Sequence, residues 1–476
     1  MSNTTYRLPS SHSSIFRGSL FFLLLCLVIR PMLAYASFTV GEEKKTGEKI
    51  QSTIRQDFNL LDDPDIDQYI SHLGREILEV AGPQFFDYRF YVINDKDFNA
   101  FAAPSGLIFI NSGLIEAMDN EDELVGVMAH EVGHVVRRHI ADSIDKGGKI
   151  GIGTAALLLA GIALGGGDLS QAVITGAMAT GTSLTLKYSR ENEEEADRQA
   201  YRWMLQMKRD PKALLSMLAK MRRIAILKVG NPPPYLLTHP APDQRQGYVQ
   251  DLLISSPPPA GLVSHRDDFH FNRIRYRTLV STRDTSTLLP RWLKKAESDD
   301  EEGWLARLGL ALLYQQDGNF AKSRQYFTEL IAHYPGQAIL KADLGVTCFR
   351  EGKTAEAIKL LDEAHAAAPN DAYTIFNLAR ALDETGQNAR ALELYQSMLS
   401  ITPTFARLHF YLGRALAENG LMGQSHYYNG MYSWLEGNIP TARFHLQKAL
   451  ENLPAKDPMR EKCRNLLEKM KQIEKM

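Results

Sequence analysis

The chain has 476 residues, enough for roughly three domains of ordinary size. Hydrophobic residues make up 44% and charged residues 23%, which is typical of a folded protein and excludes a disordered one. The 54 basic and 56 acidic side chains give a net charge of −2, which argues against nucleic acid as the main partner. Three cysteines also exclude a scaffold held together by disulfides.

Residues 1–36 have the pattern of a secretory signal peptide. Arg7 and Arg17 precede the apolar run Leu20–Ile29, and Ala34–Ala36 supplies the small residues typical of a cleavage site. We therefore expect cleavage after Ala36 and export of the mature chain. An uncleaved membrane anchor is the less favoured alternative, because the apolar run is too short to span a bilayer comfortably.

Residues 37–254 combine helical patterns with a few strand-like runs. Tyr88–Ile93 and Gly106–Ile110 are rich in β-branched and aromatic residues and are bounded by turn residues, which predicts a small sheet. Ile150–Gly167 and Gln171–Leu186 are uncharged, but the glycines of the first run weaken a spanning helix. We expect helices packed over the active site here, with room for a peripheral membrane contact, rather than membrane spans.

The strongest chemical signal is the segment from His130 to His134, which reads His-Glu-Val-Gly-His. His130 and His134 lie four residues apart, so both imidazoles project from one helix face and can bind one zinc ion. Glu131 can then lie beside a water molecule at the metal. A helix with solvated histidines fits poorly, because the surrounding pattern is apolar and a buried unpaired imidazole is costly.

A hydrolytic zinc site needs a third protein ligand and an open position for water. The candidates lie in the acidic segment at residues 188–198, and helical periodicity does not choose among them. They are Glu191, Glu193, Glu194 and Glu195. Such a carboxylate run is also typical of a solvated helix face. Glu193 and Asp197 are four residues apart and share one face.

Ser255–Gly261 is rich in proline and interrupts every pattern, so residues 255–284 are interpreted as a linker. Residues 285–476 are helical and repeat every 34 residues. The repeated turn and helix-ending residues are Gly318, Gly352 and Gly386, with Pro335, Pro369 and Pro403. This spacing closely resembles the tetratricopeptide repeat, although Gly437 follows Gly420 too soon for a regular fourth copy. Such repeats typically form a concave protein-binding surface, and a purely structural helical stack is the alternative.

Three segments together resemble a known family of zinc endopeptidases, the HtpX and CAAX-prenyl-protease group. They are Asn99–Leu114, His130–His134 and Glu193–Asp197. The domain order resembles the periplasmic branch of that group, the BepA-like β-barrel assembly-enhancing proteases. The resemblance implies an α-rich α+β fold, in which a zincin-like metallopeptidase domain with a small β-sheet (37–254) precedes an all-α tetratricopeptide solenoid (285–476).

The resemblance also implies roles for individual residues. His130, His134 and Glu193 are the implied ligands of one Zn²⁺ per chain, and Glu131 is the implied general base. Asp197 corresponds to an acidic residue that orients a ligand imidazole. The residues implied to align an extended substrate along an edge strand are Asn99, Ala100, Phe101 and Ala102.

A proline-rich loop contains Thr238-His239-Pro240 and is followed by Arg245, and this pattern also resembles the family. We predict that His239 and Arg245 are catalytic. His239 either stabilises the transition state or swings onto the zinc as a fourth ligand, which would make the enzyme latent. The remaining alternative is a histidine on a surface loop.

The sequence therefore favours an exported, periplasmic zinc endopeptidase that degrades misfolded or stalled outer-membrane β-barrel proteins. Its repeats are expected to bind unfolded clients or the β-barrel assembly machinery. The rival is a periplasmic chaperone or assembly factor in which proteolysis is secondary or suppressed. A prenyl-protein protease is less favoured, because the signal peptide and the lack of several apparent membrane spans oppose it. The pattern leaves open whether Cys348 pairs with Cys463.

Overall fold

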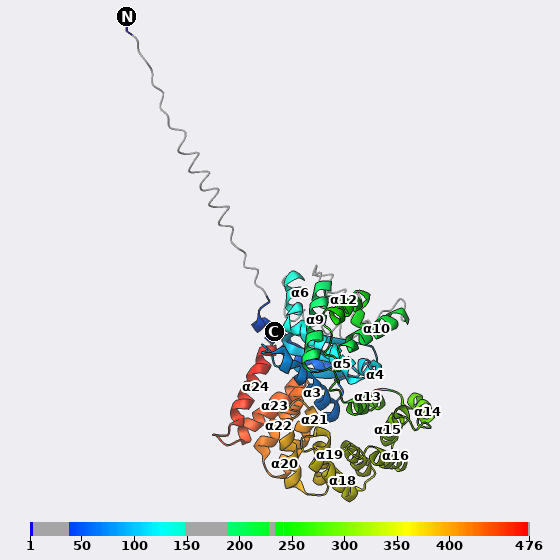
Figure 1. The fold of residues 1–476 in the computed structure, drawn as a ribbon. Coiled ribbons are helices and arrows are strands. Elements are labelled where there is room, and N and C mark those ends of the chain that lie inside the picture. Colours follow the sequence, from blue (N-terminus) through cyan, green and yellow to red (C-terminus); the bar gives the residue numbers. More distant parts are fainter. Residues whose placement is uncertain (3–37, 148–187, 228–233, 241, 475–476) are drawn as a thin grey trace.

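The computed structural model describes residues 1–2, 38–147, 188–227, 234–240 and 242–474. Nearly all of the predicted signal peptide and both uncharged runs, 150–167 and 171–186, lie outside the described residues. Figure 1 shows two bodies: a domain coloured from blue to green, and an arc of paired helices, coloured from olive to red, that curves along one side of it. Among the described residues, no helix is both long and apolar enough to cross a membrane.

The N-terminal domain is built on a three-stranded sheet with the strand order β1-β3-β2. β1 (Arg89–Ile93) is parallel to β3 (Leu107–Asn111), and these are the two strands that the sequence pattern predicts. β2 (Ala100–Ala103) is antiparallel to β3 and is joined to it by the 3₁₀ turn η1 (Pro104–Gly106), whose last residue has a φ of 78°. Because β2 pairs on one side alone, it is an edge strand of the described sheet.

Helices cover this sheet and enclose the core of the domain. α3 (Pro64–Ala81) packs against β1, α5 (Glu121–Val136) against β2, and α2 (Val40–Asp57) against η1. The other helices of this domain are α4 (Ser112–Ala117), α6 (His139–Gly147), α9 (Arg190–Gln206), α10 (Lys212–Leu227), α11 (Pro234–Thr238) and α12 (Pro242–Ser255).

The crossing of α5 and α9 brings two distant parts of the sequence together. α5 begins after Asn120, whose side-chain oxygen accepts a hydrogen bond from the backbone N–H of Glu123, and α9 begins after the capping residue Ser189. At Gly133 the two helices approach so closely that a Cβ atom would lie 3.3 Å from the backbone of Ala196. A glycine at this position therefore lets the faces of the two helices meet.

The region interpreted as a linker, 255–284, is irregular only in part. Residues up to Asp267 contain no helix after α12, but Asp268–Thr282 form helix α13. Phe271 and Ile274 of α13 belong to the core of the N-terminal domain, whereas Tyr276 and Leu279 belong to the first core of the helical arc. α13 therefore joins two hydrophobic cores, which the proline-rich segment before it does not reveal.

The C-terminal body consists of antiparallel helix pairs. Its helices are α14 (Thr285–Lys295), α15 (Glu301–Gln316), α16 (Phe320–His333), α17 (Ile339–Arg350), α18 (Thr354–Ala367), α19 (Ala372–Glu384), α20 (Asn388–Met398), α21 (Ala406–Glu418), α22 (Met422–Leu435), α23 (Ile439–Asn452) and α24 (Met459–Glu474). Gly318, Gly352 and Gly386 have φ between 76° and 86° in the turns within pairs, a conformation that favours glycine. The predicted repeat solenoid is confirmed.

The end of the arc departs from this regularity, as the early Gly437 predicts. Gly437 (φ 75°) turns the chain directly from α22 into α23, and α24 then packs on α23. Gly430 of α22 would, with a Cβ atom, lie 2.9 Å from Leu446 of α23, so the two helices pack closely. Cys348 and Cys463 are both buried and free, one in α17 and the other in α24.

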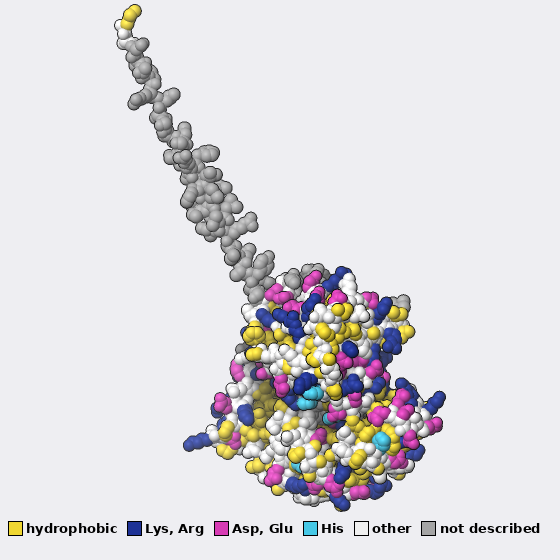
Figure 2. Space-filling model, viewed as in Figure 1, with side chains coloured by type: hydrophobic (Ala, Val, Ile, Leu, Met, Phe, Trp, Pro, Cys, Tyr) yellow, Lys and Arg dark blue, Asp and Glu magenta, His cyan; other side chains and the backbone are white. Residues whose placement is uncertain are grey.

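The arc is fixed to the N-terminal domain at several places. Arg273 of α13 is fully buried and donates to both carboxylate oxygens of Asp343 in α17, at 2.8 and 2.9 Å, and also to Asp65 of α3. At the far end, Lys469 of α24 lies 3.0 Å from Glu48 of α2. The repeats therefore curve around the start of α3. Figure 2 shows side chains of both charges interspersed over the visible face of both bodies.

Candidate metal centre

Helix α5 supplies two histidines to a buried cluster. His130 and His134 lie one turn apart, and their Nε2 atoms are 3.0 Å from each other. Neither side chain is exposed to solvent. Burial lowers the pKa of His134 well below its usual range, which favours the neutral imidazole that a metal requires.

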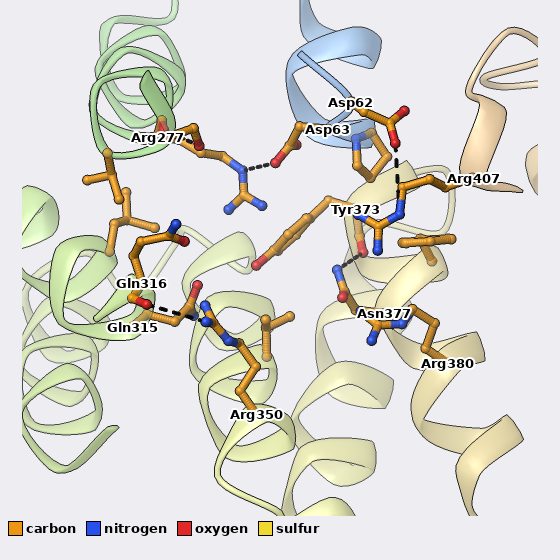
Figure 3. A pocket seen from close by; sticks show the side chains of 16 residues that line it. Asp62, Asp63, Arg277, Gln315, Gln316, Arg350, Tyr373, Asn377, Arg380 and Arg407 are labelled. Atoms are coloured by element: carbon orange, nitrogen blue, oxygen red, sulfur yellow. Dashed lines mark hydrogen bonds and ion pairs between the residues drawn. The ribbon is translucent and has the colours of Figure 1, made fainter. Parts of the chain in front are cut away.

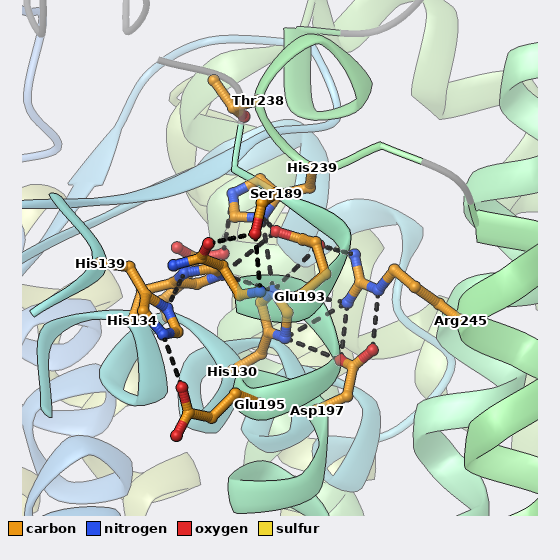
Figure 4. A network of polar contacts seen from close by, with 12 residues as sticks. His130, His134, His139, Ser189, Glu193, Glu195, Asp197, Thr238, His239 and Arg245 are labelled. Carbon is orange, nitrogen blue, oxygen red and sulfur yellow. Dashed lines mark hydrogen bonds and ion pairs between the residues drawn. The ribbon is translucent and has the colours of Figure 1, made fainter. Parts of the chain in front are cut away.

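Helix α9 brings a carboxylate to the same point (Figure 4). Glu193 has Oε1 3.4 Å from Nε2 of His134 and Oε2 3.6 Å from Nε2 of His130. The neighbouring carboxylates point elsewhere: Glu194 pairs with Arg198, and Glu195 lies 3.1 Å from Arg137. Glu191 is exposed near the start of α9, so tertiary structure separates the candidates that periodicity leaves equivalent.

The loop after α11 adds His239 as a fourth member. Its Nδ1 lies 3.0 Å from Oε1 of Glu193 and 3.3 Å from Nε2 of His130, and its ring stacks on Tyr235 at 4.2 Å. Burial opposes a charged imidazole here, but the carboxylates of Glu131 and Glu193 outweigh it and raise the pKa of His239. One ligand atom from each of His130, His134, Glu193 and His239 lies within 4.8 Å of the others.

Glu131 lies at the edge of this cluster and is completely buried. Its Oε1 accepts a hydrogen bond from the Tyr235 hydroxyl at 3.2 Å and lies 3.5 Å from Nε2 of His239. Its Oε2 has no hydrogen-bond partner in the part of the chain that the structure describes. Burial raises the pKa of Glu131, since the carboxylate form is poorly solvated. A buried carboxylate oxygen without a partner leaves a place for a water molecule or another donor.

Asp197 and Arg245 support the cluster from behind. Asp197 Oδ1 lies 2.8 Å from Nδ1 of His130, the ring nitrogen that faces away from Glu193. Arg245 of α12 donates from Nε and Nη2 to the two carboxylate oxygens of Asp197, both at 2.8 Å, and its Nη1 lies 2.8 Å from Oε2 of Glu193. Burial of Asp197 is outweighed by Arg245 and His130, so the pKa of Asp197 falls to about 2. A carboxylate that stays ionised can hold the imidazole in one orientation.

His139, Tyr188 and Tyr235 also contact the cluster, and sequence reasoning assigned them no role. Nδ1 of His139 lies 3.0 Å from Nδ1 of His134, and its Nε2 lies 3.1 Å from Glu195. Tyr188 stacks on His134 at 3.8 Å and its backbone N–H donates to the carbonyl of Thr238. None of these residues falls within a recognisable spacing, so only the folded chain reveals the contacts.

The stretch proposed to align substrate begins at the start of β2. Asn99 is fully buried, and its carbonyl accepts from the backbone N–H of Asn111 at 2.9 Å. Its side-chain amide has no hydrogen-bond partner within the described ranges. Ala100, Phe101 and Ala102 form most of β2 and are also buried, next to α5. The structure therefore places this stretch on an edge strand beside the helix that carries His130, His134 and Glu131.

The donor set fits a transition metal of the zinc type. Imidazole nitrogens and one carboxylate oxygen are the ligands that zinc takes in hydrolytic proteins, and the supporting carboxylate on His130 is typical of such sites. The unpartnered oxygen of Glu131 lies beside these donors. His130, His134 and Glu193 would hold the ion, and His239 is positioned as a further donor.

Comparison with known proteins agrees with this geometry. Residues 63–252 match the model of Peptidase family M48, and residues 308–372 and 349–409 match models of the Tetratricopeptide repeat. The chain is 28% identical over 343 residues to the Beta-barrel assembly-enhancing protease of Escherichia coli (strain K12), covering 70% of this chain and 68% of that protein. It is 29% identical over 310 residues to the Putative beta-barrel assembly-enhancing protease of Vibrio cholerae, covering 64% and 63%. Metalloprotease LoiP of Escherichia coli is 32% identical over 170 residues, which cover 35% of this chain and 62% of that protein.

The matched segments fall within the two bodies of the structure, the peptidase match in one and the repeat matches in the other. The peptidase match runs from just before α3 into α12 and so includes every helix that contributes to the cluster, while the repeat matches run from α15 into α21. The predicted order of an α-rich domain with a small sheet followed by repeats is confirmed. This chain is therefore a metallopeptidase whose domain of family M48 is followed by tetratricopeptide repeats.

Proposed function

We propose that this protein is a zinc endopeptidase of the cell envelope that cleaves misfolded or stalled outer-membrane β-barrel proteins. The observation that carries the proposal is the buried cluster of His130, His134 and Glu193, with Glu131 beside it. Similarity to the β-barrel assembly-enhancing proteases supports the class of client. The predicted signal peptide at residues 1–36 supports export to the periplasm.

A zinc ion held by His130, His134 and Glu193 would supply Lewis-acid activation of water and of the peptide carbonyl. Glu131 takes the proton from the attacking water and returns it to the leaving amine as the peptide bond breaks. Asp197, clamped by Arg245, keeps His130 in one orientation. Asn99–Ala102 would align an extended client through main-chain hydrogen bonds, so that cleavage depends little on side-chain identity.

His239 is proposed to keep the enzyme latent. Its ring lies among the donor atoms, where it occupies space that water and a substrate carbonyl need. Movement of the loop that contains Thr238 and His239 would open this position when a client binds. If His239 instead stabilises the transition state, its removal lowers peptidase activity. Removal raises basal activity if His239 keeps the enzyme latent, so the two roles predict opposite changes.

Metal analysis of the freshly purified protein tests the proposal most directly. We expect one zinc ion per chain in the wild type and a clear loss in Glu193→Ala. Glu194→Ala should keep the metal, because Glu194 pairs with Arg198 and does not belong to the cluster. A wild-type protein that binds no zinc after purification or reconstitution would contradict the proposal.

The second candidate is a chaperone or assembly factor in which proteolysis is suppressed. It is favoured by the complete burial of His130, Glu131 and His239, because a closed site cannot admit a client without rearrangement. Glu131→Gln separates the two functions in cells that lack the wild-type protein. Failure of the inactive variant to restore envelope assembly supports the endopeptidase, and full rescue supports the binding role.

A further inference from the structure

A separate pocket, which none of the metal-cluster residues line, lies between the loop before α3 and the repeats (Figure 3). It has a volume of about 280 Å³. Its walls come from the first helix of successive pairs, namely α15, α17, α19 and α21, together with α13. The loop that contains Asp62 and Asp63 closes one side.

The charges that line this pocket are predominantly positive. Its arginines are Arg277, Arg350, Arg380 and Arg407, against two lining carboxylates, Asp62 and Asp63. Arg277 lies 2.8 Å from Asp63, and Arg407 lies 3.8 Å from Asp62. Arg350 and Arg380 make no ion pair with a carboxylate among the described residues. Two guanidinium groups at the pocket are thus left uncompensated.

Arg380 is held in place by aromatic rings rather than by an acid. Its guanidinium lies over Phe349, Phe376 and Tyr411, at 5.3, 5.9 and 5.4 Å from the ring centroids. Contacts of this kind orient the planar group but leave its N–H donors free for an anion. Its side chain is therefore arranged for ligand binding before any ligand arrives.

Tyr373 provides an independent sign that a ligand is missing. Its side chain is 2% exposed, its hydroxyl has no hydrogen-bond partner among the described residues, and it lines the pocket. In Figure 3 this hydroxyl points into the space between Arg277 and Arg350. A buried hydroxyl without a partner is costly, so a group that accepts its hydrogen bond would stabilise the site.

We infer that this pocket binds a carboxylate group of an acidic peptide segment. Unpaired guanidinium groups favour a planar carboxylate, which they can bind through paired hydrogen bonds, and Tyr373 supplies a further donor. Apolar Val346 and Phe376 and the amide of Asn377 also line the pocket and suit the rest of a polypeptide. The identity of this peptide as a client or assembly partner rests on the proposed function, whereas its binding does not.

The test uses the full chain with Glu131→Gln, so that no peptide is hydrolysed. A fluorescein-labelled peptide ending in Glu-Asp-Glu is compared with the same peptide ending in Gln-Asn-Gln, each with a free and an amidated C-terminus, by fluorescence anisotropy. We expect the acidic peptides to bind at least about tenfold more tightly, as expected for the loss of a charge-assisted hydrogen bond. Comparison of the free and amidated ends shows whether the terminal or a side-chain carboxylate is bound.

Substitutions locate the binding site. Arg380→Gln and Arg350→Gln should each weaken binding by about tenfold, whereas Arg464→Gln, an exposed arginine of α24 outside the pocket, should leave it unchanged. Because Arg350 is exposed, its variant remains informative if Arg380→Gln does not fold. The inference would be overturned by equal binding of the acidic peptide with a free C-terminus and the amidated Gln-Asn-Gln peptide, whose end carries no carboxylate. It would also be overturned if neither pocket substitution had an effect, or if inorganic phosphate bound and the acidic peptide did not. If the chain binds the acidic peptide but no zinc, the proposed function is refuted and the inference about the pocket stands.

Discussion

The metal cluster and the arginine pocket hold their charges in contrasting ways. In the cluster, Glu193 and Asp197 are no more than 1% exposed, and Arg245 compensates both of them. In the pocket, Arg380 is only partly buried and rests on aromatic rings without an acidic partner. A fully buried charge must be paired, whereas a charge at a solvent-filled concavity can remain without an ion-pair partner until a ligand binds.

This difference indicates what each site is arranged to receive. The cluster directs the lone pairs of three imidazoles and one carboxylate toward a common point, which suits a cation. The pocket directs N–H and O–H donors into an open space, which suits an anion. The metal cluster and the arginine pocket are therefore separate sites, one suited to catalysis and the other to ligand binding. Substitutions in one site should leave the other intact.

The largest expected effect is on catalysis. Glu131→Gln removes the proposed general base and should lower kcat by about 10²–10⁴-fold. Its zinc content and its affinity for the acidic peptide should stay at wild-type values, because Glu131 is neither a proposed ligand nor part of the pocket. Glu194→Gln, one residue beyond Glu193, serves as the matched control in a fluorogenic peptide assay. Wild-type turnover by Glu131→Gln would place the base elsewhere.

The next effect concerns the joint between the two bodies. Arg273→Ala removes the nearer of the two guanidinium groups that Asp65 and Asp343 share and leaves them only Arg277, at 3.5 and 3.8 Å, which should lower the free energy of unfolding by up to about 3–5 kcal/mol. Lys341→Ala removes an exposed pair with Glu363 and should cost only about 0–1 kcal/mol. Urea unfolding followed by circular dichroism compares the two variants. Equal midpoints would show that the buried network does not hold the repeats against the peptidase domain.

His239→Ala tests whether the cluster is closed by its own loop. If the open form is a minor state of about 10%, removal of the ring should raise basal peptidase activity by about tenfold. The peptidase rate is normalised to the amount of bound zinc, because loss of a metal donor also lowers the zinc occupancy of the site. Unchanged activity would exclude latency, and a fall would assign His239 to the transition state.

The smallest expected effect depends on pH. Burial raises the pKa of Asp67 in α3 from 3.8 to about 7. The folded state therefore resists ionisation of this carboxyl, and the contribution of Asp67 to stability falls as pH rises from about 4 to about 7. Asp67→Asn should raise the melting temperature more at pH 8 than at pH 5. Asp87→Asn, at an exposed position, controls for the lost charge, and equal shifts at both pH values would contradict the prediction.

Several parts of the structure could be predicted because they depend on local spacing. The interval between His130 and His134 places both side chains on one helix face, and the 34-residue glycine pattern sets the helix pairs. Both follow from helix geometry within one segment. The two strand-like runs likewise became β1 and β3.

Other parts depended on contacts between distant segments. The sequence contains no indication that Phe271 enters one hydrophobic core and Tyr276 another. The proline-rich stretch before α13 favours a linker, and the pattern of the helix after it is therefore not recognised. The contact of His139 with His134, and the position of Tyr235 beside Glu131, have no characteristic spacing in the sequence. They arise only when α5, α6 and α11 pack together.

By itself, the sequence determined the two kinds of domain and the helix face that carries the paired histidines, because helical periodicity is a property of the chain alone. Only the tertiary structure brought the carboxylate of Glu193, which the family resemblance implies as a ligand, beside both histidines, through the close crossing of α5 and α9 at Gly133. It alone also gathered Arg350, Tyr373 and Arg380 around one pocket. The physical reason is that ion pairing and desolvation act between elements far apart in sequence, whose approach is decided by packing.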